Sequence, residues 1–174
     1  TRAETQNGSN QSVAAYDYSY GPAQRLNSVT DSRGGKQLFY TWTPGGRLAK
    51  VEDSDGHQAS MSYDATGRLA SVVAPNGETI GFTYDAGGRL VEQRLNSGQR
   101  TTQSWFEDGG LKQKQNLYNA TVLSSHLYTI DQQGRRATQS ENIGGVTKTW
   151  SYLYDNLDRI TTASDGTAET YGYD

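Results

Sequence analysis

Tyr63-Asp64-Ala65-Thr66-Gly67-Arg68-Leu69 is the stretch of this sequence that determines the fold. Its residues suit a tight turn between two strands, because the aspartate can accept backbone N–H groups and the glycine accepts positive φ without strain. We expect a type I turn closed by a left-handed glycine bulge. In that register Asp64 lies opposite Arg68 on one face, and Tyr63 lies opposite Leu69 on the other. Each such hairpin would carry an ion pair on one face and an apolar pair on the other.

The same pattern recurs along the chain with a period of about 21 residues. We align its copies on the residue directly before the turn, which we call the anchor. Successive anchors are 22, 21, 21, 21, 25, 24 and 19 residues apart, and seven of the eight are aromatic. Such an internal repeat indicates an array of supersecondary units that pack on their neighbours. The anchors are Tyr20, Trp42, Tyr63, Tyr84, Trp105, Ile130, Tyr154 and Tyr173.

Four further positions define the repeat, and we predict that all of them are structural. Aspartate follows the anchor as Asp64, Asp85, Asp131 and Asp155, whereas Gly21, Thr43 and Phe106 stand there in other repeats, so the ion pair is optional. The glycine position holds Gly46, Gly67, Gly88, Gly109 and Gly134, with Gln24 and Asp158 as substitutes. The following Arg and Leu positions hold Arg25-Leu26, Arg47-Leu48, Arg68-Leu69, Arg89-Leu90, Leu111, Arg135 and Arg159-Ile160. The turn geometry is therefore the firmer requirement, and Gln24 fits it least well.

A second turn lies about midway between anchors, so that each repeat contains two strands. These turns are Ser32-Arg33-Gly34-Gly35, Ser54-Asp55-Gly56, Pro75-Asn76-Gly77, Asn96-Ser97-Gly98, Ile143-Gly144-Gly145 and Ser164-Asp165-Gly166. We expect a longer loop around residues 117–120, where the spacing stretches to 25. No window has a sustained helical period. The predicted fold is all-β: consecutive antiparallel hairpins in a continuous curved or spiralling sheet, with a partial repeat or disordered lead-in over 1–12 and an array of seven to eight repeats over 13–174.

Composition sets limits on the function. The 174 residues are only 33% hydrophobic, so any buried layer must be thin. The net charge of −3, with neither sign gathered into a run, gives no footprint for nucleic acid. No apolar stretch is long enough for membrane insertion by a helix, and the absence of cysteine removes disulfides and thiolate metal sites.

No residue pattern indicates an enzyme, a cofactor or a metal site. His57 and His126 are 69 residues apart, and one turn aspartate per repeat does not supply a calcium coordination sphere. Neither a nucleophile elbow nor a phosphate-binding loop occurs. The recurring rings could stack on sugars, and this leaves a carbohydrate- or partner-binding module open as an alternative function.

Residues 82–90 and 61–69, each of the form Y-D-x-x-G-R-L after a preceding strand, resemble the RHS/YD repeats of bacterial Rhs proteins and Tc-toxin C components, and more distantly those of teneurins. The resemblance extends from about residue 13 to residue 174. It implies a structural scaffold, a shell segment that encloses or displays a toxin or effector polypeptide. It also implies a bacterial protein that is secreted or at the cell surface.

The same resemblance implies partners. The repeats would continue in a longer parent chain, because the sequence stops within an eighth motif at Tyr171-Gly172-Tyr173-Asp174. The family's self-cleaving core has no counterpart in these residues, so we expect that this segment does not release a cargo alone. Unpaired edge strands of an isolated segment would favour edge-to-edge self-association.

Overall fold

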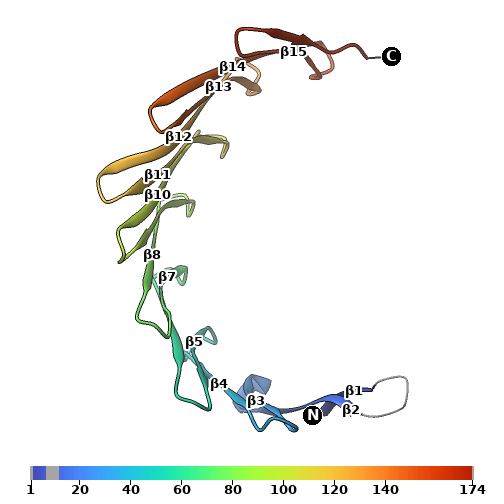
Figure 1. Ribbon diagram of the computed structural model, residues 1–174, viewed down its shortest axis with the longest axis vertical. Coiled ribbons are helices and arrows are strands. Elements are labelled where there is room, and N and C mark those ends of the chain that lie inside the picture. The colour runs from blue at the N-terminus through green and yellow to red at the C-terminus, as the bar shows by residue number, and fades with distance from the viewer. Residues whose placement is uncertain (1, 7–11, 174) are drawn as a thin grey trace. The chain divides into compact units, whose positions relative to one another are not determined.

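The computed structural model describes residues 2–6 and 12–173, and these residues form antiparallel strands joined by turns (Figure 1). A single 3-10 turn, η1 (Pro22–Gln24), is the one helical element among them. The predicted all-β fold of consecutive hairpins is confirmed. The strands are β1 (Arg2–Gln6), β2 (Ser12–Tyr20), β3 (Leu26–Asp31), β4 (Gln37–Trp42), β5 (Leu48–Asp53), β6 (Gln58–Tyr63), β7 (Leu69–Val73), β8 (Thr79–Tyr84), β9 (Leu90–Leu95), β10 (Gln99–Trp105), β11 (Leu111–Tyr118), β12 (Thr121–Ile130), β13 (Arg136–Ile143), β14 (Val146–Tyr154), β15 (Ile160–Ser164) and β16 (Ala168–Thr170).

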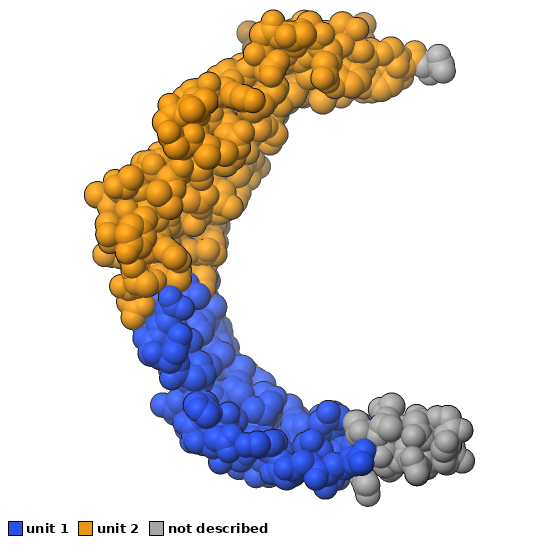
Figure 2. All heavy atoms as spheres, viewed as in Figure 1, with its two compact units in different colours: residues 1–80 blue, residues 81–174 orange. Residues whose placement is uncertain are grey.

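The chain has two compact units, residues 1–80 and residues 81–174 (Figure 2). In the first unit, β1 to β7 pair antiparallel in the order in which they occur in the sequence. In the second unit, β9 to β16 do the same. Strand β8 contains the boundary between the units. Within each unit every hairpin therefore packs on the hairpin that precedes it in the sequence.

A bulge at the anchor fixes the register of each hairpin. Tyr63 pairs with Leu69, and the register shifts between Ser62 and Tyr63. Gly67 in this turn has φ 84° and Gly88 has φ 81°, which confirms the predicted left-handed turn glycines. In five other hairpins the anchor also pairs with the residue at the Leu position, and the register also shifts there. These pairs are Tyr20 with Leu26, Trp42 with Leu48, Trp105 with Leu111, Ile130 with Arg136 and Tyr154 with Ile160.

Two turns depart from the glycine pattern. In the first described hairpin Ala23 and Gln24 have φ 58° and 59°, and the chain there forms η1. Asp158 has φ 62°, which a short polar side chain tolerates better than most. The poor fit predicted for Gln24 thus corresponds to a turn of a different shape.

The expected long loop around residues 117–120 is wrong. Strand β11 runs to Tyr118 and β12 begins at Thr121, so only two residues connect them. Asn119 has φ 51°, a backbone region that Asn enters readily, and this allows a tight turn. The extra residues lengthen the strands instead: β11 has 8 residues and β12 has 10.

The buried layer is thin, as the composition predicts. Among the described residues the buried apolar side chains are Ala15 and Leu117, which are 1% and 7% exposed. Most other apolar strand residues are half-buried. The sheet therefore depends on backbone pairing and on contacts between hairpins more than on a deep core.

The division into a lead-in over 1–12 and a repeat array over 13–174 remains a prediction. The lead-in over 1–12 includes residues 1 and 7–11, which lie outside the described residues, while β1 occupies 2–6. None of the helical structure in the described part of the chain is long and apolar enough to cross a membrane.

Candidate functional site

The turn aspartate organises the hairpin from within. The Oδ1 of Asp64 accepts the backbone N–H groups of Thr66 and Arg68, each at 2.9 Å. Its Oδ2 accepts the Nε–H of Arg68 at 2.7 Å. One carboxylate therefore satisfies two turn amides and one guanidinium, as the sequence predicts for this turn.

Four hairpins share this arrangement. The Arg Nε lies 2.8 Å from the Asp Oδ2 in Asp85–Arg89 and in Asp131–Arg135, and 2.7 Å in Asp155–Arg159. Each Asp also accepts the backbone N–H of its Arg at 2.9 Å.

These hydrogen bonds hold the aspartates in the charged form. The backbone N–H of Arg68 lowers the pKa of Asp64 far below its usual range, and the Arg68 side chain lowers it further. The pKa values of Asp85 and Asp155 are lowered by the equivalent arginine N–H groups. Partial burial raises the pKa of Asp131, but the backbone N–H and guanidinium of Arg135 outweigh it.

Where aspartate is missing, the backbone part of the turn persists. The Thr43 N–H donates to the Arg47 carbonyl at 2.8 Å, and Thr43 Oγ1 accepts the Arg47 N–H at 3.1 Å. The Phe106 N–H donates to the Gly110 carbonyl at 2.8 Å, as the Asp64 N–H does to Arg68. The turn geometry is therefore common to hairpins with and without the ion pair.

The anchor rings connect neighbouring hairpins. The Tyr63 hydroxyl donates to the backbone carbonyl of Leu48 at 2.8 Å, in the strand that precedes its own. Four other anchor rings make an equivalent bond, and the acceptor is always the backbone carbonyl at the Leu position of the preceding hairpin. The Nε1–H groups of Trp42 and Trp105 donate to the carbonyls of Leu26 at 2.7 Å and Leu90 at 2.9 Å. The hydroxyls of Tyr154 and Tyr173 donate to the carbonyls of Arg136 at 2.8 Å and Ile160 at 2.7 Å. Arg136 holds the Leu position in its repeat.

The ring bond lies just beyond the end of the backbone ladder. Strands β5 and β6 pair from Glu52–Gln58 to Lys50–Ser60, and the Leu48 carbonyl lies two residues past the last pair. A carbonyl left without a partner in a half-buried strand end is costly, and the Tyr63 hydroxyl supplies the missing donor. The anchor side chain thus extends the sheet pairing where the strands separate toward the turn.

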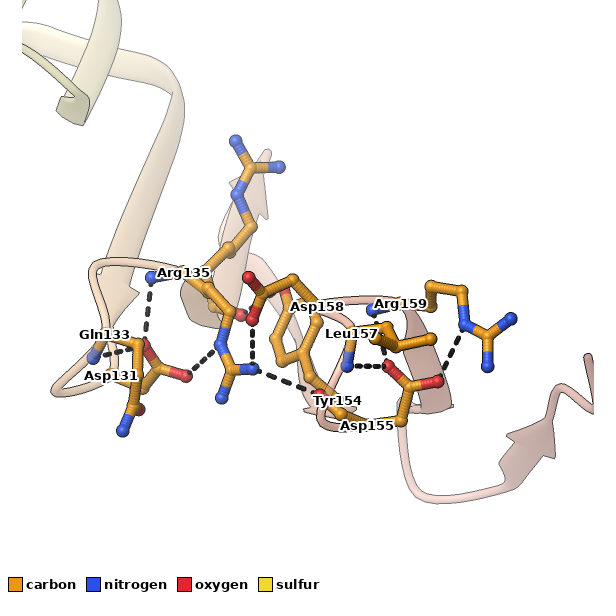
Figure 3. Close-up of polar contacts among 9 residues, drawn as sticks. Asp131, Gln133, Arg135, Tyr154, Asp155, Leu157, Asp158 and Arg159 are labelled. Atoms are coloured by element: carbon orange, nitrogen blue, oxygen red, sulfur yellow. Dashed lines mark hydrogen bonds and ion pairs between the residues drawn. The ribbon is translucent and has the colours of Figure 1, made fainter.

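Arginine provides a second connection, which Figure 3 shows for the turns around Arg135 and Arg159. The Arg135 Nε binds Asp131 in its own turn, and its Nη1 donates to Asp158 Oδ1 in the next turn at 2.7 Å. Its guanidinium carbon lies 4.6 Å from the centroid of the Tyr154 ring. Arg135 therefore joins two successive turns and covers the anchor ring between them.

The same connection recurs elsewhere in both units. The guanidinium carbon of Arg47 lies 5.6 Å from the Tyr63 centroid, and that of Arg159 lies 4.4 Å from the Tyr173 centroid. The Arg89 Nη1 donates to the Phe106 carbonyl at 2.7 Å. Such cation–π contacts are worth about 0.5–1 kcal/mol each at exposed positions.

The turn glycine also gives space to the arginine of the preceding hairpin. A Cβ placed on Gly67 would overlap the guanidinium of Arg47, and one on Gly46 would lie 2.6 Å from Nη2 of Arg25. At Gly77, in a midway turn, nothing lies within 4 Å of such a Cβ. At Gly46 and Gly67 a side chain is therefore disfavoured for two reasons, the positive φ and the arginine that crosses the glycine.

The anchors differ in exposure. Tyr20, Tyr173 and Ile130 are 54%, 47% and 39% exposed, and Ile130 has no ring that could donate a hydrogen bond. The anchors Trp42, Tyr63, Tyr84, Trp105 and Tyr154 are half-buried.

Sequence reasoning missed the ring-to-carbonyl bond, although a signal for it is present. All seven aromatic anchors are Tyr or Trp, whereas the position two residues earlier also accepts Phe82 and Met61. Phe has no polar hydrogen, so its absence from the anchor position points to a required donor.

Neither histidine lies in a catalytic arrangement. His57 Nδ1 lies 3.0 Å from Asp53 Oδ2 on an exposed turn, and His126 Nδ1 lies 3.6 Å from Glu141 Oε1. Asp53, Asp55 and His57 bring their ligand atoms within 4.8 Å of one another. Asp53 already accepts the N–H groups of residues 55 and 57, and Asp55 pairs with Lys36.

Antiparallel hairpins that are tied to their neighbours by rings and guanidinium groups define a β-hairpin repeat protein. Residues 42–79 and 63–102 match the sequence model of the family described as RHS Repeat. Together with the fold, this match shows that the chain contains RHS repeats (YD repeats) over residues 42–102. A comparison with curated proteins gave no match.

Two solved structures have a similar fold. One is described as TcdB2-TccC3-TEV, with 16% identity and a TM-score of 0.63 over 94% of this chain. The other is described as TcdB2-TccC3-Cdc42, with 17% identity and a TM-score of 0.66 over 94% of this chain. This chain spans 10% of each of those chains, so the likeness concerns the repeat fold.

Proposed function

We propose that this chain is a wall segment of an RHS-repeat shell that encloses or displays a toxin or effector polypeptide. The observation that carries the proposal is the hydrogen bond from five of the anchor rings to the preceding hairpin, as in Tyr63 to Leu48. These bonds use the polar atoms of the rings to hold hairpins together. The repeat residues then serve the wall itself, and no catalytic role is assigned to them.

The similar structures support this proposal because they share the fold. The match to RHS repeats supports it because such repeats imply a shell role. The partners would be the neighbouring repeats of a longer parent chain and a polypeptide held by the shell. An isolated segment would also present the edge of β16 to a second copy. The parent protein would be secreted or exposed at the cell surface.

The ring contacts weigh against the alternative of a carbohydrate-binding module. A sugar platform needs exposed ring faces, whereas Arg135 covers Tyr154 and Arg159 covers Tyr173. Trp42 and Trp105 donate their only polar hydrogen to a backbone carbonyl, so it is not offered to a sugar hydroxyl. Arginine-covered, hydrogen-bonded rings suit a wall better than a sugar platform.

Limited proteolysis of the parent polypeptide that contains this chain tests the wall function. A wall predicts that a segment outside the repeats resists protease and becomes digestible when Tyr63→Phe and Trp105→Phe loosen the hairpins. Tyr40→Phe is the matched control, because the Tyr40 hydroxyl makes no hydrogen bond within the described residues. If no segment outside the repeats is protected, the enclosing role is refuted.

A further inference from the structure

A groove in the first unit lies across strands β2 to β5 and has a volume of about 390 Å³. Its floor contains Tyr16, Val29 and Leu38. Val29 pairs directly with Leu38 across β3 and β4, so these side chains form one continuous apolar strip. Tyr16 is 41% exposed and Leu38 is 40% exposed, which leaves the strip open to a partner.

Carboxylates stand beside each part of this strip. Asp31 pairs with Tyr16 across β2 and β3, and Asp53 pairs with Leu38 across β4 and β5. Asp55 lies in the turn after β5 and also lines the groove. The groove therefore contains two pairs of an apolar and an acidic residue, Tyr16 with Asp31 and Leu38 with Asp53.

The charge of the groove is negative. Asp31, Asp53 and Asp55 contribute −3 and Lys36 contributes +1, which gives −2 among the described lining residues. Lys36 is already paired with Asp55. Backbone N–H groups hold the pKa values of Asp31 and Asp53 below the usual range, so both carboxylates remain charged at neutral pH.

We propose that this groove binds an extended polypeptide segment in which aliphatic side chains alternate with Lys or Arg. The apolar and acidic side chains of the groove share one face of the sheet, because they are direct cross-strand pairs. An extended peptide whose side chains run along that face sends alternate side chains to opposite sides, so its aliphatic residues can lie on the strip while its cations reach the carboxylates beside it. The volume is in the range of sites that accommodate a few side chains. The proposal rests on the proposed function insofar as the segment belongs to the polypeptide that the wall holds.

Fluorescence anisotropy of a labelled nine-residue peptide of alternating valine and lysine, titrated with the intact chain, tests the proposal. A peptide of alternating valine and glutamate is the matched probe. We expect binding of the lysine peptide only. Leu38→Ser and Asp55→Lys should each weaken that binding about tenfold or more, since one removes apolar contact and the other brings the groove charge from −2 to 0.

Asp165→Lys is the control variant, because Asp165 occupies the same Ser-Asp-Gly turn sequence in the second unit and does not line the groove. It should leave the affinity unchanged. Equal loss in Asp165→Lys would mean unspecific attraction to negative charge and would overturn the proposal. Equal binding of the glutamate peptide would overturn the assigned charge preference.

Two further outcomes identify other occupants. Self-association of the chain that is abolished by Leu38→Ser, without peptide binding, would assign the groove to a second copy and overturn the proposal. Circular dichroism of Leu38→Ser and Asp55→Lys separates lost binding from lost fold. Peptide binding without a protease-protected segment in the parent would support the groove and refute the enclosing wall, whereas the reverse result would refute the groove alone.

Discussion

The Tyr63 hydroxyl donates a hydrogen bond of 2.8 Å to the backbone carbonyl of Leu48, a residue of the preceding hairpin. Lys50 and Ser60 form the last backbone pair of β5 and β6, and the Tyr63–Leu48 bond lies beyond that pair. A side chain thus completes a backbone ladder, and the same relationship recurs in both units. The aromatic residues that recur about every 21 positions therefore also supply recurring hydrogen-bond donors.

Tyr63→Phe should destabilise the first unit by about 0.5–1.5 kcal/mol, because the ring remains while the Leu48 carbonyl loses its donor. Urea unfolding followed by far-UV circular dichroism measures the change. Tyr40→Phe removes a hydroxyl that makes no hydrogen bond within the described residues and should change stability by less than about 0.5 kcal/mol. Equal effects of the two substitutions would show that the ring bond contributes nothing.

Gly67→Ala should cost more than Gly77→Ala. Both glycines have positive φ, at 84° and 82°, so both substitutions introduce backbone strain of about 1 kcal/mol. Only at Gly67 does the new Cβ displace the Arg47 guanidinium from its place near the Tyr63 ring. We expect a further loss of about 0.5–1 kcal/mol there, measured by thermal unfolding.

Gly77 thus serves as the control for the strain alone. If Gly77→Ala were as damaging as Gly67→Ala, the arginine contact would not matter. Gly67→Val should be worse than Gly67→Ala, because a β-branched residue resists positive φ more strongly.

The turn aspartates predict acid sensitivity. Their pKa values are lowered in the folded state, so the stability that they provide is present above the unfolded value of about 3.9 and is lost as the pH falls below it. The melting temperature should be level from about pH 7 to 5 and fall below about pH 4. Asp64→Asn should lower it at pH 7 and reduce the fall toward acid.

An asparagine at position 64 keeps one oxygen acceptor for the turn amides but has no charge for Arg68. A variant Asp165→Asn, at an exposed aspartate of a midway turn, provides the comparison. The interpretation fails if both variants have the same pH profile as the unaltered chain.

Ile130→Tyr should stabilise the second unit. Ile130 stands at an anchor position and pairs with Arg136, so a tyrosine there would place its hydroxyl toward the Leu111 carbonyl as Tyr63 does toward Leu48. The expected gain is about 0.5–1.5 kcal/mol in chemical unfolding. Ile130→Phe supplies the ring without the donor, and an equal gain from it would attribute the effect to packing.

The sequence predicts a feature of this structure when all the residues that form it lie in one hairpin. The Gly67 turn and the Tyr63–Leu69 pair were predictable, because a single hairpin contains every residue that they need. The bond from Tyr63 to Leu48 joins two hairpins, and the pattern within one repeat does not reveal it. The restriction of the aromatic anchors to Tyr and Trp was the available signal.

The turn at Asn119 shows a second limit. A spacing of 25 residues indicates extra chain but not where it goes. In the structure it lengthens β11 and β12, since Asn119 accepts positive φ and permits a two-residue connection. The exposure of the groove around Leu38 was equally hidden, because it depends on which strand residues meet across four strands.

The most direct test of the central claim is the unfolding free energy of Trp42→Ala, compared with that of the unaltered chain. The wall account predicts a loss of about 2 kcal/mol, because the half-buried ring and its bond to the Leu26 carbonyl both disappear. An unchanged unfolding free energy, together with loss of specific sugar binding in the same variant, would contradict the account and favour a glycan-binding module.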